Sequence, residues 1–312
     1  MPNYITIDGG TTNTRIYLVK NGKITDTKQV NVGAQKAIGN NEILKHTIKQ
    51  GIKEILEKND MREDGIKRIL VSGMITSEFG LVNLPHITLP VGISDLHRTM
   101  YETVFNDISS IPFVFVRGIK TNGESLENCD MMRGEETELM GVFCGEGTYI
   151  LPGSHSKIIN VEKNGKITDF KTMLTGEMIA TLSENTILKD SVDIKNTEID
   201  HEYLLKGFEF CKQNGINNSL FKVRILKNML SANASQVYSF FLGVVLHSEI
   251  EFILSQKQKR IIIGGRKQLK EALAIILEKL SSEEITKVED AEADFASAFG
   301  LIKIYEFKKR GR

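Results

Sequence analysis

Short apolar runs alternate along this chain with longer stretches in which apolar residues recur at helical spacing. In the first half, the runs predict strands at residues 4–7, 15–19, 68–73 and 112–116. Residues 41–59 carry an apolar stripe with the period of a helix. Between these elements, residues 80–98 hold Pro85 and Pro90 and predict an irregular loop, the kind of segment that often carries binding groups.

The second half repeats this alternation and adds helices. We expect a strand meander over residues 149–173, followed by helices at residues 176–188, within 200–255 and at 268–280, strands at 260–263 and 285–288, and a last helix at 294–307. In that last helix Ala296, Ala298 and Gly300 would let another backbone approach closely. Alternating strands and helices predict layered α/β domains rather than a barrel or a bundle.

One heptapeptide occurs twice. Lys20–Asp26 recurs unchanged as Lys163–Asp169, and each copy follows a strand, a polar turn and a second strand. Two ordinary hairpins could converge on this sequence, because both residues of an Asn-Gly pair tolerate the positive φ of a type I′ turn. The identity of all seven residues and the matched polar turns favour duplication instead. We therefore predict that residues 4–29 and 149–171 superpose.

The length of 312 residues exceeds what a single core usually supports, so two domains are expected. Periodicity is lost near residues 118–128, which places the predicted boundary there. The predicted domains are residues 1–120 and 121–312, with the final helix packing back toward the first domain.

Charge and cysteine content narrow the class of protein. Lys+Arg and Asp+Glu both number 40, so no basic field favours nucleic acid or an anionic membrane as a partner. The three cysteines are widely spaced and predict neither a disulfide framework nor a zinc site. We found no secretory leader pattern and no apolar run of about 18 residues. A cytoplasmic enzyme is the expectation.

The first chemical motif directly follows the first strand. Gly10, Thr11, Thr12 and Asn13 form a polar turn whose backbone amides and hydroxyls can bind phosphate. Asp8, at the end of the strand, could hold a hydrated Mg²⁺ that bridges phosphates. The alternative is an ordinary glycine hairpin in which Asp8 caps its own turn.

Two further glycine turns follow strands in the second half. Gly153, Ser154, His155 and Ser156 offer amide and hydroxyl donors for phosphate, and we expect His155 to be a hydrogen-bonding group rather than a proton shuttle. Gly264 and Gly265 follow a buried strand and precede a helix, where a nucleoside and its α-phosphate can lie against backbone amides. A plain strand-to-helix connection remains the alternative for the third turn.

Phosphoryl transfer to a hydroxyl also needs a carboxylate that orients and deprotonates the acceptor. Glu135 is our first candidate for this base and Glu136 the second, although acids in a first helical turn are often only partners of the helix dipole. Cationic groups could hold an acidic substrate. The candidate substrate-binding residues are Arg15, Arg133, Lys157 and the helix-start acid Glu177.

Four segments together resemble the 2-dehydro-3-deoxygalactonokinase family, sugar-acid kinases of the actin, hexokinase and Hsp70 superfamily. They are Asp8–Arg15, Met132–Thr137, Pro152–Lys157 and Leu174–Glu177. The resemblance implies two ribonuclease-H-like α/β domains, ATP with Mg²⁺ in the cleft between them, and phosphorylation of a sugar acid. The chain departs from the common family pattern at Gly9, where Trp is frequent, so altered packing is expected there.

Other functions of the same superfamily stay open. An ATPase switch or a sugar-responsive regulator would also grip a polyphosphate, but such regulators commonly carry a DNA-binding segment before the first motif, and here three residues precede Tyr4. A kinase of a neutral sugar is disfavoured by the cationic candidates. Neither the preferred sugar acid nor the oligomeric state follows from the sequence, which leaves a homodimer open.

Overall fold

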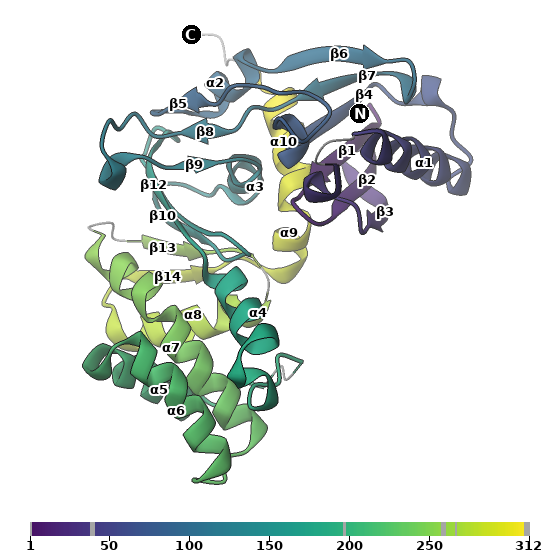
Figure 1. The fold of residues 1–312 in the computed structure, drawn as a ribbon. Helices are drawn as coiled ribbons and strands as arrows, with labels where there is room; N and C mark the ends of the chain where they lie inside the picture. Colours follow the sequence, from purple (N-terminus) through teal and green to yellow (C-terminus); the bar gives the residue numbers. More distant parts are fainter. Residues whose placement is uncertain (1, 38–40, 196–197, 257–259, 266, 309–312) are drawn as a thin grey trace. The chain divides into compact units, whose positions relative to one another are not determined.

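The computed structural model describes residues 2–37, 41–195, 198–256, 260–265 and 267–308 (Figure 1). The chain forms two compact units. Unit 1 comprises residues 1–145, 162–169 and 295–312, and unit 2 comprises residues 146–161 and 170–294. The predicted boundary near residue 120 therefore falls inside unit 1. The reason is that the strands and the helix over residues 119–142 pair and pack with other elements of this unit.

Unit 1 is built on a six-stranded sheet of order β3-β2-β1-β4-β7-β6. Its strands are β1 (Tyr4–Gly9), β2 (Thr14–Lys20), β3 (Lys23–Val30), β4 (Arg68–Gly73), β6 (Tyr101–Phe105) and β7 (Ser109–Phe115). The first three strands form an antiparallel meander, whereas β4 runs parallel to β1 and to β7. One face is covered by α1 (Glu42–Lys58), whose Ile48 and Ile52 pack in a core with Ile5 and Ile16. The meander beside parallel strands is the arrangement expected for a ribonuclease-H-like sheet.

A smaller sheet and three helices complete unit 1. The sheet has the order β5-β8-β9, with β5 (Ile87–Thr88), β8 (Ile119–Lys120) and β9 (Met131–Met132). The helices are α2 (Ile93–Arg98), α3 (Glu135–Val142) and α10 (Ala296–Tyr305). A Cβ on Gly300 would collide with the carbonyl oxygen of Thr137, and a Cβ on Gly141 with that of Ala296. The backbones of α10 and α3 thus lie in close contact, as the small residues of α10 predicted.

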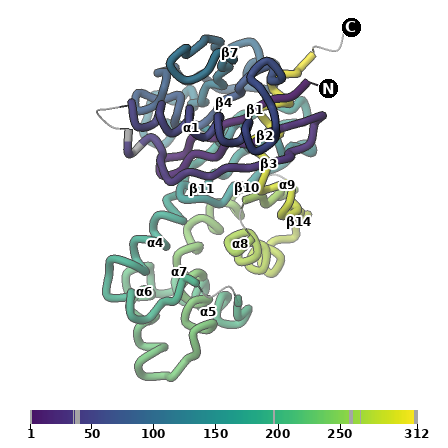
Figure 2. Tube along the Cα trace, turned by 90° about the vertical axis from the view of Figure 1, so that its right-hand side faces the viewer, coloured from purple at the N-terminus to yellow at the C-terminus, as the bar shows by residue number. Residues whose placement is uncertain are grey.

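Unit 2 repeats the sheet scheme with the order β12-β11-β10-β13-β14. Its strands are β10 (Gly147–Leu151), β11 (Ser156–Val161), β12 (Ile167–Met173), β13 (Arg260–Ile263) and β14 (Glu284–Lys287). Strand β10 is antiparallel to β11 and parallel to β13. The helices are α4 (Thr175–Asn185), α5 (His201–Asn214), α6 (Ile216–Asn228), α7 (Ala234–Ser255), α8 (Lys267–Leu280) and α9 (Asp290–Asp294). Figure 2 shows α4 to α7 gathered below the strands β10 and β11.

Helix α7 is the central helix of unit 2. Its side chains Phe241, Leu242 and Leu246 are fully buried in the core of this unit. Among the described residues it is also the one helix long and apolar enough to cross a membrane, and 72% of its apolar window is buried inside the protein. Burial of this extent is typical of a core helix.

The two copies of the heptapeptide adopt different turns. In the first copy both Asn21 (φ 51°) and Gly22 (φ 77°) have positive φ, as a type I′ turn requires. In the second copy Gly165 (φ 76°) has positive φ but Asn164 does not, so this turn is not of type I′. Ile167, two residues after Gly165, exchanges backbone hydrogen bonds with Val91.

Candidate active site

Unit 1 brings glycines and acids together at the carboxyl ends of β1 and β4. Gly9 pairs with Gly73, which has a φ of 85°, and a Cβ on Gly134 would lie 3.2 Å from the Gly73 Cα. These close contacts let the start of α3 lie against the end of the sheet. At Gly9 an added Cβ would lie 2.7 Å from the Cβ of the buried Ile75, so Ile75 fills the space in which a large side chain would sit.

Turn 1, residues 9–13, connects β1 to β2. Its Gly10 amide donates to the Asn13 carbonyl over 2.8 Å, and the Gly10 carbonyl accepts from Ala34 over 3.1 Å. Thr11 and Thr12 are exposed. The turn is therefore braced from within by its backbone while its threonines face outward, as a phosphate-binding turn requires.

Asp8 stands at the start of turn 1 and is 24% exposed. Its nearest cation is Arg15 on the paired strand, with 3.7 Å between Arg15 Nη1 and Asp8 Oδ2. Burial raises the pKa of Asp8 most, Arg15 lowers it, nearby Glu135 raises it, and a hydrogen bond with Ser297 lowers it. Two carboxyl groups in one partly buried place repel each other, so the site favours a bound cation or a proton.

The acids suit magnesium better than a metal that needs a full cage of protein ligands. No cluster of three or more His, Cys, Asp or Glu side chains able to hold a metal occurs in the described part of the chain. Magnesium keeps several of its waters and uses one or two carboxylates together with phosphate oxygens. Asp8, with Glu135 near it, meets that requirement.

The two adjacent acids of α3 differ sharply in environment. Glu136 is fully buried, and the Gly134 amide donates to its Oε1 and Oε2 over 3.0 and 2.8 Å. Burial, followed by repulsion from Glu135, raises the pKa of Glu136 to about 8. Glu135 is partly exposed and accepts a hydrogen bond from the Arg133 amide over 3.0 Å. Of the two, only Glu135 can meet a substrate without unpacking α3.

Arg133 is held by its own unit. Its Nη1 donates to the carbonyl oxygen (2.8 Å) and the hydroxyl (2.6 Å) of Thr76, and its Nη2 to the carbonyl oxygen of Leu84 (3.0 Å). With His86 also in reach of Nη2, the terminal nitrogens are occupied and leave little for the bidentate grip on an acid that the sequence led us to expect. Arg133 instead fastens the loop after β4 to the start of α3.

His86 is a candidate site residue that sequence reasoning missed. Its Nδ1 lies 3.3 Å from Arg133 Nη2, and because a guanidinium can only donate, Nδ1 accepts and the ring proton belongs on Nε2. Burial, then Arg133 and Lys120, lowers the pKa of His86 to about 4. The ring is thus a neutral donor beside Arg133. Its position in the proline-bounded loop was the available signal, but nothing in that loop singled it out.

Turn 2, residues 152–155, connects β10 to β11 in unit 2. The amides of Gly176 and Glu177 in the first turn of α4 donate to the carbonyls of Gly153 (3.1 Å) and Ser154 (3.0 Å). Ser156, the first residue of β11, lies at its end, with its Oγ 3.4 Å from the Gly153 amide nitrogen. The helix thus carries turn 2 on its amino end.

The predicted substrate-binding residues of unit 2 also serve turn 2. His155 Nε2 lies 2.7 Å from Glu177 Oε2, with both side chains largely exposed. Lys157 is 2% exposed, and its Nζ donates to the His155 carbonyl over 2.8 Å. Lys157 and Glu177 therefore lie beside turn 2, whereas Arg15 and Arg133 belong to the site in unit 1.

Turn 3, residues 264–265, abuts turn 2. The Gly264 amide donates to the Ile150 carbonyl over 2.8 Å. Gly265 has a φ of 71°, and a Cβ there would lie 2.7 Å from the Pro152 carbonyl oxygen. Unit 2 thus places two of the predicted nucleotide turns together at the carboxyl ends of β10 and β13. Arg266, the next residue, lies outside the described residues.

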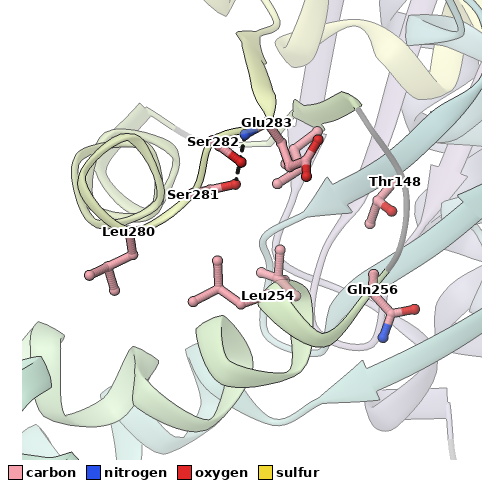
Figure 3. Close-up of a pocket in the computed structure, with 9 residues that line it drawn as sticks. Thr148, Leu254, Gln256, Leu280, Ser281, Ser282 and Glu283 are labelled. Carbon is pink, nitrogen blue, oxygen red and sulfur yellow. Dashed lines mark hydrogen bonds between the residues drawn. The ribbon is translucent and has the colours of Figure 1, made fainter.

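A separate pocket of about 240 Å³ lies near the amino ends of β10, β13 and β14 (Figure 3). Thr148, Leu254, Gln256, Leu280 and Ser281 are among its lining residues. The Thr148 hydroxyl and the Gln256 side chain both hydrogen-bond with Asn160, so these polar groups are already satisfied within unit 2. None of the predicted site residues lines this pocket.

Comparison with known proteins identifies the family of the chain. The model of the family described as 2-keto-3-deoxy-galactonokinase matches residues 8–304. The 2-dehydro-3-deoxygalactonokinase of Escherichia coli strain K12 is 25% identical over 272 residues, which are 84% of this chain and 85% of that protein.

Two solved structures share the fold. A Sinorhizobium meliloti protein provisionally described as a 2-dehydro-3-deoxygalactonokinase superposes with a TM-score of 0.77 at 21% identity, over 96% of this chain and 97% of that one. Component A of the (R)-2-hydroxyglutaryl-CoA dehydratase of Acidaminococcus fermentans has a TM-score of 0.54 at 16% identity, over 98% and 100% of the chains. With a family match over nearly its whole length, the chain belongs to the 2-keto-3-deoxy-galactonokinase family and is a phosphotransferase that acts on an alcohol group.

Proposed function

We propose that this protein uses ATP to phosphorylate the terminal hydroxyl of a 2-dehydro-3-deoxy sugar acid, with 2-dehydro-3-deoxy-D-galactonate converted to its 6-phosphate as the first choice. The observation that carries the proposal is the pair Asp8 and Glu135 beside turn 1. A phosphate-binding turn with one acid for a metal and one for the acceptor is what a kinase needs. Family membership supports the substrate class.

On the acceptor side, Glu135 orients the hydroxyl and receives its proton as the oxygen forms a bond to the γ-phosphorus. The bond from that phosphorus to the β-phosphate oxygen breaks, and ADP leaves. Glu136 does not take this role in the proposal, because both of its oxygens accept from the Gly134 amide. His86, a neutral donor, and the charge of Arg133 favour an acidic sugar beside Glu135.

On the nucleotide side, turn 1 binds phosphate in unit 1, and in unit 2 turn 2 binds phosphate and turn 3 binds the nucleoside. Asp8 would hold the hydrated Mg²⁺, which, when bound, neutralises charge that develops on the transferring phosphoryl group. Thr11 and Thr12 are exposed, while backbone hydrogen bonds hold the neighbouring Gly10, and both features support this role for turn 1.

The proposal also includes a compartment. Cys129 is an exposed thiol outside any disulfide. Such a thiol persists best in a reducing environment, so we place the enzyme in the cytoplasm.

A coupled assay of ADP release over a panel of sugar acids and neutral sugars tests the function. We expect turnover that requires magnesium and a 2-dehydro-3-deoxy sugar acid. A neutral hexose panel, an acid lacking the 2-keto group and a no-acceptor reaction serve as controls. Turnover with neutral hexoses and none with any sugar acid would show that the substrate class is wrong. ADP release without an acceptor would favour an ATPase switch.

A further inference from the structure

Glu249 is a buried acid with no place in the mechanism above. It lies on α7, the central helix of unit 2, and is 1% exposed. The Thr175 hydroxyl, on the first residue of α4, makes a short hydrogen bond to its Oε2. Ser156, at the end of turn 2, also hydrogen-bonds to the carboxyl group. One side chain therefore joins α7, α4 and turn 2.

These bonds reinforce backbone contacts between the same two segments. The first amides of α4 donate to the carbonyls of turn 2, and a Cβ on Gly176 would collide with the Gly153 carbonyl. Turn 2 thus packs directly against the start of α4. Glu249 reinforces this contact, because its carboxyl group hydrogen-bonds to both Thr175 and Ser156.

The environment of the Glu249 carboxyl group lowers the stability of the protein. Its Oε1 is buried and has no hydrogen-bond partner among the described residues. Burial raises the pKa of Glu249 to about 7, against the lowering effect of Thr175 and Ser156. A buried polar atom without a partner costs stability, so an apolar residue would serve a purely structural core position better.

We propose that Glu249 is a positioning residue that holds turn 2 on α4 in the geometry needed to bind the phosphates of the nucleotide. The inference rests on the proposed function for the role of turn 2. It concerns a residue that touches neither phosphate nor sugar acid, and it acts through Ser156 and Thr175.

The test compares Glu249→Ala with Glu249→Gln and with the control Glu251→Ala. Gln keeps the volume and an acceptor oxygen for Thr175, whereas Ala removes both. Glu251 lies two residues along α7 at the surface, where it pairs with Lys212. Each variant is measured for ADP release with the sugar acid and for amide hydrogen exchange with and without ATP.

We expect Glu249→Ala to lower kcat about tenfold or more, since misplacement of a binding turn by a fraction of an ångström is costly. The KM for the sugar acid should stay near the parent value. Amide exchange should rise at residues 153–157 and 175–178 and stay unchanged in β1 and β4. Glu249→Gln should keep most of the parent kcat, and Glu251→Ala all of it.

Three results would overturn the inference. Glu249→Ala could keep both the parent kcat and the parent exchange at turn 2. Exchange could instead rise throughout both units, which would mean a general loss of stability. ATP could fail to protect turn 2 in the parent protein, which would remove its phosphate role. A parent that shows ATP protection of turn 2 but no turnover with any sugar acid would count against the proposed substrate and leave the role of Glu249 supported.

Discussion

Turns 1 and 2 connect the first two strands of equivalent sheets, yet their surroundings differ in charge and in support. Turn 1 follows Asp8 and lies near a second acid, Glu135. Turn 2 is followed by the buried cation Lys157 and rests on the first amides of α4. The two equivalent turns thus carry different groups, because acids lie beside turn 1 and added donors lie beside turn 2. In the proposed reaction the acids serve the metal and the acceptor, whereas the donors serve phosphate.

The largest effect should come from substitution of Glu135, the acid beside turn 1. We expect Glu135→Gln to lower kcat on the order of 10²–10⁴-fold, because the acceptor hydroxyl loses its base. Steady-state ADP release measures this, with Glu138→Gln one turn along α3 as the matched control. Parent rates in both Glu135→Ala and Glu136→Ala would show that α3 does not supply the base.

Asp8→Asn should affect turnover more than binding. We expect kcat to fall about 10²-fold, a typical loss when an electrostatic group acts mainly on the transition state. The dissociation constant for ATP, measured by calorimetry, should change much less, since the backbone of turn 1 is intact. The same loss at every magnesium concentration up to saturation is expected. Normal turnover at saturating magnesium would remove Asp8 from the mechanism.

Burial of Glu136, followed by repulsion from Glu135, should also appear as pH-dependent stability. Glu136 has a folded pKa of about 8 against an ordinary value of 4.5, so between these pH values the folded state holds more protons than the unfolded state. Its contribution to stability is therefore complete at low pH and is lost as the pH rises toward about 8. Urea unfolding should give a free energy that falls more between pH 5 and pH 9 in the parent than in Glu136→Gln, by about 2 kcal/mol or more. Equal pH slopes would show that Glu136 is ionised when folded.

The exposed pair beside turn 2 should matter least. His155 and Glu177 are 41% and 58% exposed, and ion pairs at such positions typically contribute about 0–1 kcal/mol. We expect His155→Ala to change Tm only slightly and to leave kcat near the parent value, because Lys157 and α4 still brace the turn. A large kcat loss with unchanged Tm would instead make His155 a direct partner of phosphate.

The sequence predicted what local patterns encode. Apolar runs placed the meander strands, and small residues in the last helix predicted its close packing with another backbone, which is that of α3. It did not predict that the two Asn-Gly segments adopt different turns, because the seven residues are identical in both copies. His86 and Glu249 were missed because their partners are distant in sequence. The sequence predicts that Arg133 clamps an acidic substrate, but it does not predict that Arg133 donates to Thr76 and Leu84 of another loop.

Helix α10 has a consequence for the order in which the protein can mature. Its residues, 296–305, belong to unit 1, contact β1, β4 and α3, and provide Ser297 beside Asp8. During synthesis these residues leave the ribosome after all of unit 2. Unit 1 therefore cannot cover the surface that packs against α10 until the end of synthesis. Unit 2 has its complete sequence before that. In a growing chain the surroundings of turn 2 would therefore be complete before those of turn 1, although turn 1 comes first in the sequence.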